Sequence, residues 1–279
     1  MRIHHYIKNL LVFAALACSG QFFNLEKLTS GLLAFVSFCL ISSVVYIIND
    51  IRDREKDSKH PTKCNRPIAA GKISVKNAWT LAAVLFAVVC VCNYLIFNLT
   101  SSLLLLAYFV LNLAYSFGLK NVPIADIAIL VSGFLLRILY GAIVTDIVIS
   151  NWLYLTVIAV AFYFSLGKRR NELKQLGGNE TRKVLKAYPL NFLDKSMTMC
   201  LTLANIFYAL WSMDDNTAAH YNNDYLIFTV PLVMLITLKY SMTVEGDSDG
   251  DPVEVLLHDK ILLLLCGVYA ATMFIILYI

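Results

Sequence analysis

Long apolar stretches alternate with short polar segments along nearly the whole chain. All but the first stretch reach the roughly 17–25 residues that an α-helix needs to cross a hydrocarbon core of about 30 Å. The pattern predicts nine spans, at about residues 9–23, 29–48, 77–97, 101–119, 123–143, 150–167, 196–213, 224–241 and 260–279. The expected fold class is an all-α integral membrane protein, with a bundle of about nine transmembrane helices in a single polytopic domain over residues 1–279.

Composition narrows the class of protein further. Apolar residues make up 59% of the 279 residues, charged residues make up 15%, and the mean hydropathy is +0.68. Average soluble domains contain about 45–50% apolar and about 25% charged residues. The chain is therefore expected in a membrane, and its net charge of +4 does not indicate a nucleic-acid partner.

Lys and Arg gather in every second connecting segment, most densely at about residues 49–76 and 168–195. Basic residues accumulate in cytoplasmic loops. The distribution predicts a cytoplasmic N-terminus, with both of these loops cytoplasmic and only Lys27 in an outer loop. The expected location is the bacterial inner (plasma) membrane, crossed many times, with catalytic chemistry in the two long charged loops.

The run from Asn49 to Gly71 is a charged island between two apolar spans. Asp50, Asp53 and Asp57 are spaced i, i+3 and i+7, which places them on one helix face. Like charges so close are costly unless cations neutralise them, and Mg²⁺ commonly joins one or two carboxylates to substrate phosphates. The sequence predicts a Mg²⁺ site with Asp50 and Asp53 as ligands, Asn49 as an orienting amide and Asp57 as a further metal partner. The alternative is a solvated helix whose acids pair with neighbouring basic residues.

The second loop is rich in cations, which suit phosphate groups. Lys168, Arg169 and Arg170 are the candidates there, although basic residues also flank spans simply to orient them. Arg137 is different because it falls inside an expected span. A cation at that depth is costly, so we expect it to face the bundle interior and to pair with an acid or contact a ligand.

Several segments together resemble the UbiA superfamily of intramembrane prenyltransferases. They are Asn49-Asp50 with Asp53 and Asp57, the sequences HPTK at 60–63 and NRPIAAG at 65–71, and LGKRRNEL at 166–173. Within the superfamily the decaprenyl-phosphate phosphoribosyltransferases are most similar. Aromatic-prenylating members carry a second DxxxD motif, and the loop at about 168–195 has no such pair. The resemblance implies nine helices around a lipid-accessible pocket, with Mg²⁺-binding aspartates at its cytoplasmic mouth.

The resemblance also implies a reaction and its partners. The enzyme would transfer 5-phosphoribose from 5-phosphoribosyl 1-diphosphate to a polyprenyl phosphate lipid and release diphosphate. The aspartates and Asn49 would form the catalytic metal site. The implied substrate-binding residues are Lys8, His60, Lys63, Arg66, Arg137, Lys168, Arg169, Arg170 and Glu172, with Glu172 orienting a cation or a ribose hydroxyl. A homo-oligomeric assembly is compatible with this interpretation.

Two other functions stay open on the sequence. One is transfer of a prenyl group from prenyl diphosphate to an aromatic or other small acceptor. The other is a membrane transporter, with Arg137 and the carboxylates along a substrate path, although no inverted repeat is evident.

Overall fold

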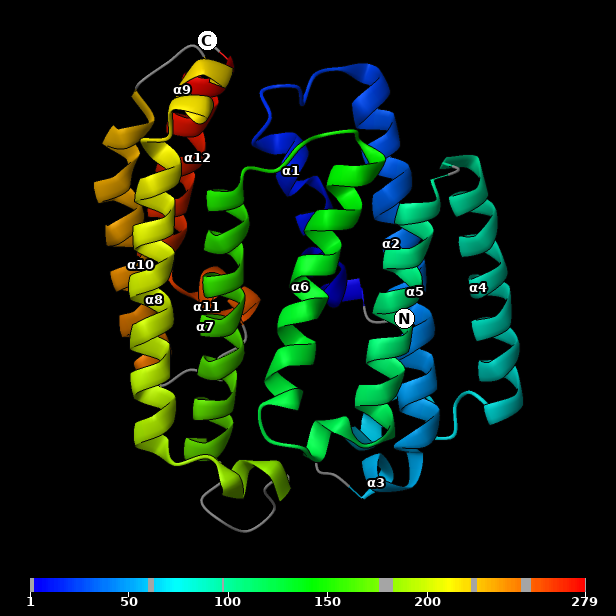
Figure 1. The fold of residues 1–279 in the computed structure, drawn as a ribbon. Coiled ribbons are helices and arrows are strands. Elements are labelled where there is room, and N and C mark those ends of the chain that lie inside the picture. The colour runs from blue at the N-terminus through cyan, green and yellow to red at the C-terminus, as the bar shows by residue number, and fades with distance from the viewer. Residues whose placement is uncertain are drawn as a thin grey trace. The chain divides into compact units, whose positions relative to one another are not determined.

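The computed structural model describes residues 3–59, 63–96, 98–175, 183–221, 225–246 and 252–278, and within these ranges it contains helices and no strands (Figure 1). The longer helices are α2 (Leu25–Arg52), α4 (Val75–Ile96), α5 (Leu99–Phe117), α6 (Ala125–Val144), α7 (Asn151–Gln175), α8 (Leu190–Ser212), α10 (Val230–Glu245) and α12 (Lys260–Tyr278). The short α-helices are α1 (Ala14–Ala17), α3 (Arg54–Ser58), α9 (Asp215–Tyr221) and α11 (Pro252–His258). The 3-10 segments are η1 (Ile3–Phe13), η2 (Lys63–Asn65), η3 (Leu119–Asn121), η4 (Lys183–Ala187) and η5 (Tyr225–Thr229).

Six described helices are long and apolar enough to cross a membrane, or seven if α8 and α9, bent by 56°, form one span. They are α2, α4, α5, α6, α10 together with η5, and α12. Each of the nine expected segments overlaps helix in the structure, but the described residues do not confirm a count of nine spans. The first expected span ends early, because its apolar helix covers only Tyr6–Ala17. Helix α7 is not among the six candidate spans, because its last turns carry charged residues and its apolar part is correspondingly short.

The helices pack into two compact units. The first comprises Met1–Ala17, Gln21–Gly118 and Leu136–Ile147, and the second comprises Cys18–Gly20, Leu119–Leu135 and Val148–Ile279. Helix α6 contributes to both, since its first half belongs to the second unit and its second half to the first.

In the first unit, α2 is the central helix. Asn24 caps its start, where the side-chain Oδ1 accepts hydrogen bonds from the backbone N–H groups of Glu26 and Lys27 at 3.0 and 3.2 Å. The helix packs against η1, α4 and α5, which is why it is apolar on nearly every side. Phe38 lies at the centre of this packing and is fully buried.

Gly141 on α6 allows an unusually close approach in the same unit. A Cβ atom at this position would lie 1.9 Å from the carbonyl oxygen of Val12 and 2.7 Å from its carbonyl carbon. Val12 is 0% exposed, so η1 passes directly over the glycine and is packed into the unit. The absent side chain therefore sets the position of the N-terminal segment.

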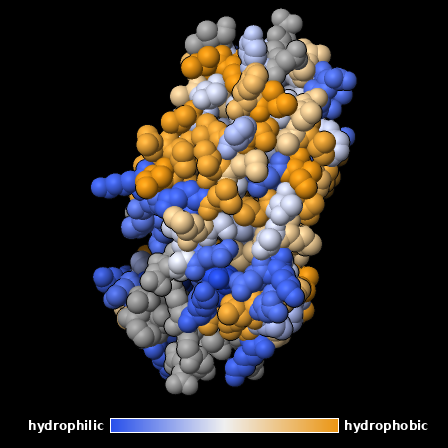
Figure 2. All heavy atoms as spheres, turned by 90° about the vertical axis from the view of Figure 1, so that its left-hand side faces the viewer, coloured by the Kyte–Doolittle hydropathy of each residue, from blue (hydrophilic) through white to orange (hydrophobic). Residues whose placement is uncertain are grey.

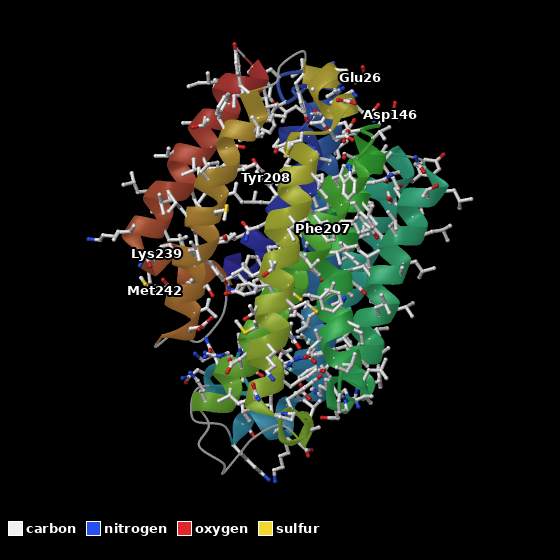
Figure 3. All side chains as sticks on the ribbon, turned by 60° about the vertical axis from the view of Figure 1, so that its left-hand side comes forward. Glu26, Asp146, Phe207, Tyr208, Lys239 and Met242 are labelled. Carbon is white, nitrogen blue, oxygen red and sulfur yellow. The ribbon has the colours of Figure 1, made fainter. Side chains whose placement is uncertain are left out.

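In the second unit, α7 and α8 run side by side (Figure 1). Figure 3 shows Tyr208 on α8, whose hydroxyl lies 2.6 Å from Thr229 Oγ1 and 3.2 Å from the hydroxyl of Tyr269. At the other end of α10, Lys239 pairs with Asp259 at 2.8 Å. These contacts join α8, α10 and α12.

Apolar side chains dominate much of the outer surface of this unit. On the face seen in Figure 2, orange apolar atoms cover the upper part and blue polar atoms gather below. Met234, Leu238 and Met242 on α10 are 49%, 62% and 64% exposed. A surface of this kind suits lipid, in agreement with the expected membrane location.

The two expected catalytic loops are more helical than the sequence indicated. Residues 168–175 continue α7, and residues 190–195 already belong to α8. The segment at about 49–76 includes the end of α2, then α3 and η2. The long apolar helices simply extend beyond their apolar windows, because charged residues such as Lys and Arg are good helix formers.

Candidate functional site

The first candidate cluster lies at the end of α2 in the first unit. Helix α2 ends at Arg52, and Asp53 separates α2 from α3. The Asp53 N–H nevertheless bonds to the Asn49 carbonyl at 2.9 Å, and the Asp57 N–H bonds to the Asp53 carbonyl at 2.8 Å. Helical spacing is thus kept across the break, and the expected grouping of Asp50 with Asp57 is present.

Arg66 joins these two carboxylates. One guanidinium nitrogen, Nη1, lies 3.4 Å from Asp50 Oδ1 and 2.5 Å from Asp57 Oδ2. The Asp57 side chain is only 6% exposed, whereas Arg66 keeps 25% of its side chain exposed. The sequence assigned Arg66 to a phosphate group, and the structure places it on the acidic motif. The cation that the like charges require is supplied within the chain.

Asn49 is fixed from a different helix. Ser116 Oγ, near the end of α5, donates a hydrogen bond to Asn49 Oδ1 at 3.1 Å. One residue along α5, the Phe117 carbonyl accepts a hydrogen bond from Arg52 at 3.3 Å. The end of α5 therefore holds the end of α2 and orients the amide of Asn49.

The fit of this cluster to a metal ion depends on the number of ligands. Among the described residues, no group of three or more His, Cys, Asp or Glu side chains could hold a metal. Asp50 and Asp57 nevertheless lie close enough together to share the guanidinium of Arg66. Asn49 adds an amide oxygen at the start of the same motif. Mg²⁺ needs only one or two protein carboxylates when substrate phosphates and water complete its shell. The oxygen-only donors fit that mode of binding.

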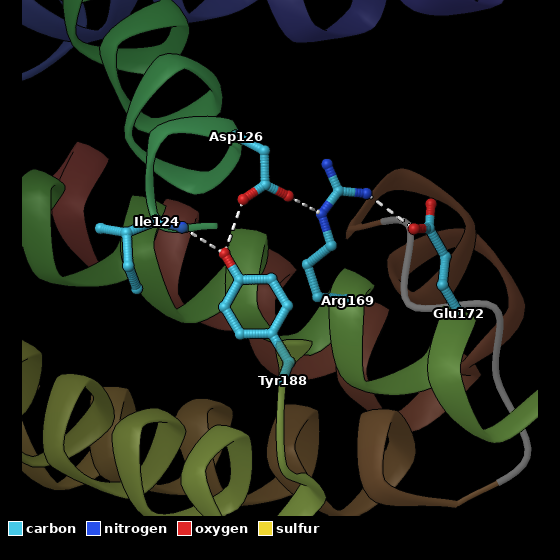
Figure 4. A network of polar contacts seen from close by, with 5 residues as sticks. All are labelled: Ile124, Asp126, Arg169, Glu172 and Tyr188. Carbon is cyan, nitrogen blue, oxygen red and sulfur yellow. Dashed lines mark hydrogen bonds and ion pairs between the residues drawn. The ribbon is translucent and has the colours of Figure 1, made fainter. Parts of the chain in front are cut away.

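The second candidate cluster lies in the second unit, at the start of α6 and the end of α7 (Figure 4). Arg169 Nε donates to Asp126 Oδ2 at 2.7 Å, and its Nη1 donates to Glu172 Oε2 at 2.7 Å. The side chains of Arg169 and Asp126 are both 0% exposed, and that of Glu172 is 19% exposed. Removing one member of such a buried pair costs about 3–5 kcal/mol, because the other charge stays buried.

Tyr188 completes this cluster. Its hydroxyl donates to Asp126 Oδ1 at 2.6 Å and accepts the N–H of Ile124 at 2.5 Å. Burial, together with the hydrogen bond to Asp126, raises the pKa of Tyr188 to about 12. Tyr188 is thus a neutral donor near neutral pH. Ile124 has a φ of +67°, which is rare for a β-branched residue.

Arg170 is paired separately from its neighbour. Its Nε donates to Asp194 Oδ1 at 2.5 Å, and its Nη1 donates to Asn171 Oδ1 at 3.4 Å. The Asn171 amide in turn donates to the Val244 carbonyl at 2.9 Å. Asp194 is 44% exposed, so this pair lies nearer to the surface than the pair of Arg169 and Asp126.

Arg137 faces the interior of the first unit, as expected. Its Nε donates to Asn9 Oδ1 at 2.9 Å, and its Nη2 donates to the hydroxyl of Tyr108 at 3.2 Å. The guanidinium carbon also lies 5.1 Å from the ring centroids of Phe38 and Tyr108. An amide oxygen, a hydroxyl and two aromatic faces thus contact this cation.

The remaining candidates are placed in part. Lys8 and Lys168 are half-buried, on η1 and α7. His60 and the side chain of Lys63 lie outside the described residues. The structure adds polar residues that the sequence did not assign to a site, namely Asp126, Tyr188 and Asp194. Asp126 lies in the first turn of an apolar helix, and this position was the one feature of the sequence that could have indicated a role for it.

Comparison with known proteins finds relatives over nearly the whole chain. The UbiA prenyltransferase family matches residues 10–258. The decaprenyl-phosphate phosphoribosyltransferase of Corynebacterium glutamicum is 35% identical over 271 residues, covering 94% of this chain and 80% of the relative. The protein of the same name from Mycobacterium tuberculosis is 33% identical over 278 residues, covering 98% and 91%.

Solved structures agree at the level of the fold. A UbiA homolog from Archaeoglobus fulgidus bound to GPP and Mg²⁺ superposes with a TM-score of 0.69 at 19% identity, covering 99% of this chain and 97% of that chain. The apo structure of a UbiA homolog from Aeropyrum pernix K1 gives a TM-score of 0.64 at 16% identity, covering 96% and 98%. This architecture is thus that of a multi-pass membrane protein.

Proposed function

Because the chain belongs to the UbiA prenyltransferase family, we propose that it transfers 5-phosphoribose from 5-phosphoribosyl 1-diphosphate to a polyprenyl phosphate of the decaprenyl type. Diphosphate is the second product. The observation that carries this proposal is the 33–35% identity, over nearly the whole chain, to proteins named decaprenyl-phosphate phosphoribosyltransferase. The polar clusters at the ends of α2 and α7 also support it, because ionisable residues in membrane proteins are costly and usually mark a functional site.

The acidic cluster is the proposed site for Mg²⁺ and the diphosphate of the donor. Asp50, Asp53 and Asp57, oriented with Asn49, would hold the metal. When bound, Mg²⁺ supplies neutralisation of the departing diphosphate. Arg66 already lies on two of these carboxylates and is partly exposed, so its guanidinium is also available to phosphate oxygens.

The cations of the second unit are proposed to serve the remaining phosphates. Lys168 is nearest to that role because it is half-buried. Arg170 is only 7% exposed, but its partner Asp194 is 44% exposed, so a phosphate could replace that carboxylate. Arg169 is fully buried against two acids, so it acts on its neighbours and not on a phosphate. Lys8 on η1 is a further candidate for the lipid phosphate.

The proposed reaction needs little proton transfer. An oxygen of the polyprenyl phosphate forms a bond to the anomeric carbon of ribose, while the bond from that carbon to the diphosphate oxygen breaks and its electron pair leaves with diphosphate. The attacking phosphate oxygen is already anionic near neutral pH, so a strong general base is not required. In-line attack inverts the anomeric configuration. Positive charge developing on the sugar ring resembles that in glycoside hydrolysis.

We also propose the orientation that the basic residues indicate, with the N-terminus and both charged segments cytoplasmic in a bacterial inner membrane. The end of α2 and the end of α7 would then meet water-soluble donor from the cytoplasm. A polyprenyl phosphate would enter from the lipid. Membership in a transferase family disfavours the transporter alternative.

The test is transfer of labelled 5-phosphoribose from 5-phosphoribosyl 1-diphosphate to decaprenyl phosphate by the purified protein in detergent, with Mg²⁺ or with chelator. We expect labelled lipid only with Mg²⁺. Asp50→Asn and Asp57→Asn should each lower the rate by 100-fold or more, while Glu55→Gln, an exposed acid in the same run, should not. Absence of labelled lipid, with prenyl transfer from a prenyl diphosphate in its place, would refute the proposal.

A further inference from the structure

We propose that Arg66 is an internal counter-ion of the acidic cluster at the end of α2, and that its guanidinium exchanges between Asp57 and the diphosphate of the donor. The inference rests on the proposed function and gives Arg66 a role beyond contact with phosphate. While Arg66 lies on Asp57 it competes with a metal ion for that carboxylate. Once it lies on diphosphate, the carboxylate is available to the metal.

Asp57 is the buried residue of an otherwise exposed helix. All other residues of α3 (Arg54–Ser58) are exposed, whereas the Asp57 side chain is only 6% exposed. Its Oδ2 lies 2.5 Å from Arg66 Nη1, and no other cation in the described part of the chain pairs with it. A carboxylate buried to this degree is costly without a positive partner. Arg66 can therefore leave Asp57 only if another cation replaces it.

The guanidinium lies on the carboxylates that the proposed metal site uses. Besides its contact with Asp57, Arg66 Nη1 lies 3.4 Å from Asp50 Oδ1. A guanidinium and a divalent cation that share the same carboxylates repel each other. The two cations therefore compete, and the ion pair with Arg66 lowers the affinity of this cluster for a metal ion.

Arg66 also has the means to bind a second anion. Its contacts with Asp50 and Asp57 use only Nη1, and its Nε and Nη2 have no partner among the residues that the structure describes. The side chain is 25% exposed. Arginine binds phosphate oxygens through a planar fork of such donors. The diphosphate of the donor can therefore accept the guanidinium as it leaves Asp57.

The exchange needs only the side chain of Arg66 to move. The Ala70 N–H donates to the Arg66 carbonyl at 2.8 Å, and the Ile73 N–H donates to the carbonyl of Pro67 at 3.1 Å. Ile68 is 6% exposed and packs against residues of α2 and α4. These contacts hold the backbone in place. Exposed side chains change rotamer within nanoseconds, so a partly exposed arginine can change partners without a movement of the chain.

The first experiment measures binding of Mn²⁺, which suits carboxylate and water ligands as Mg²⁺ does, by electron paramagnetic resonance of the free ion. Purified protein in detergent is used without donor or lipid. We expect Arg66→Gln to lower the Kd by about 10- to 100-fold, the range for a hydrogen bond between charged groups. Arg66→Lys keeps a cation for Asp57, and its shorter side chain should give a Kd between those of wild type and Arg66→Gln.

Two further variants show where the gain in affinity arises. Arg54→Gln is the matched control, because Arg54 is an exposed cation on the same helix as Asp57. Solvent and salt screen such a charge, so its Kd should stay within about twofold of wild type. The double variant Arg66→Gln/Asp57→Asn should lose the gain, because the oxygen for which the two cations compete has been neutralised.

Thermal unfolding gives a readout that does not depend on activity. Without a divalent cation, Arg66→Gln should have a lower Tm than wild type, because Asp57 stays buried without a cation. Added Mg²⁺ should raise the Tm of this variant more than that of wild type, because a ligand that binds more tightly stabilises more. An ion pair that served only the fold would lower the Tm without increasing the response to Mg²⁺.

The donor tests the other half of the exchange. With saturating Mg²⁺ and decaprenyl phosphate, the KM for 5-phosphoribosyl 1-diphosphate should rise about 10-fold in Arg66→Gln. Tighter binding of metal and weaker binding of donor from one substitution is what an exchange requires. A residue that only contacts phosphate would change the KM and leave the Kd for Mn²⁺ as it is.

The results separate the inference from the proposed function. A Kd for Mn²⁺ that is unchanged or higher in both Arg66 variants would overturn the inference, even if the wild type transfers phosphoribose. An unchanged KM for the donor would overturn it as well. Absence of phosphoribosyl transfer by the wild type would refute the proposed function, and the Mn²⁺ measurements would then still decide whether Arg66 is the counter-ion of the cluster.

Discussion

Gly141 offers the sharpest test of how the first unit is packed. In Gly141→Ala the new Cβ would lie 1.9 Å from the Val12 carbonyl oxygen, where contacts below 3.0 Å force something to move. The obstacle is backbone, which cannot rotate away like a side chain. Segment η1 would have to shift by about 1 Å to bring the 1.9 Å distance to the 3.0 Å limit, because a close-packed interior leaves no room to absorb the overlap.

The magnitude follows from three terms. Overpacking a tight core costs about 1–3 kcal/mol. A shift of η1 also stretches the 2.9 Å hydrogen bond from Arg137 to Asn9, and a bond to a charged group is worth about 1.5–3 kcal/mol. Alanine regains up to about 1 kcal/mol of helix propensity over glycine. The net loss is about 1.5–5 kcal/mol, or at least about 3 °C in Tm at the scale of 2–4 °C per kcal/mol.

The assay is thermal unfolding of the purified protein in detergent, followed by intrinsic fluorescence. Gly267→Ala on α12 is the matched control, because nothing lies within 4 Å of a Cβ built at that glycine. Its Tm should stay the same or rise slightly. Equal Tm values for Gly141→Ala, Gly267→Ala and wild type would refute the close packing of η1 on α6.

Two further changes test other parts of the fold. Hydrogen bonds from Lys239 and Thr243 lower the pKa of Asp259. The ionised carboxylate therefore stabilises the fold fully above the usual carboxyl pKa of about 3.9, and this stabilisation declines as the pH falls below that value. The Tm advantage of wild type over Asp259→Asn should shrink below about pH 4, and a constant difference in Tm would contradict this prediction. Arg137→Lys should lower Tm by several degrees because an ammonium group cannot reproduce the planar fork bound to its partners, whereas Arg54→Lys at an exposed position should not.

The candidate site was only partly visible in the sequence. The acidic motif could be identified because its residues are local, and helical spacing brings Asp50 and Asp57 together without knowledge of the fold. Arg66 could be noted as a cation but not placed, because it lies nine positions beyond Asp57 and outside the helix that carries that aspartate. Asp126 and Arg169 are 43 positions apart, and nothing in local periodicity pairs them.

The sequence by itself determined the class of the protein. Whether a helix can cross a membrane depends on its length and its hydropathy. Hydropathy is summed over many residues, so a single polar residue does not change the prediction. The number of spans was less certain, because it depends on where each helix ends, and the charged turns of α7 continue a helix that the hydropathy pattern had ended.

Tertiary structure alone decided which partner each charged side chain meets. Arg169 and Arg170 are adjacent in sequence and identical in chemistry, yet one is 0% exposed between two acids and the other pairs with a carboxylate that is 44% exposed. The difference arises because neighbours on a helix point in directions about 100° apart, so each meets a different helix. Local periodicity does not specify these long-range contacts, so only the packing of the helices determines which partner each arginine has.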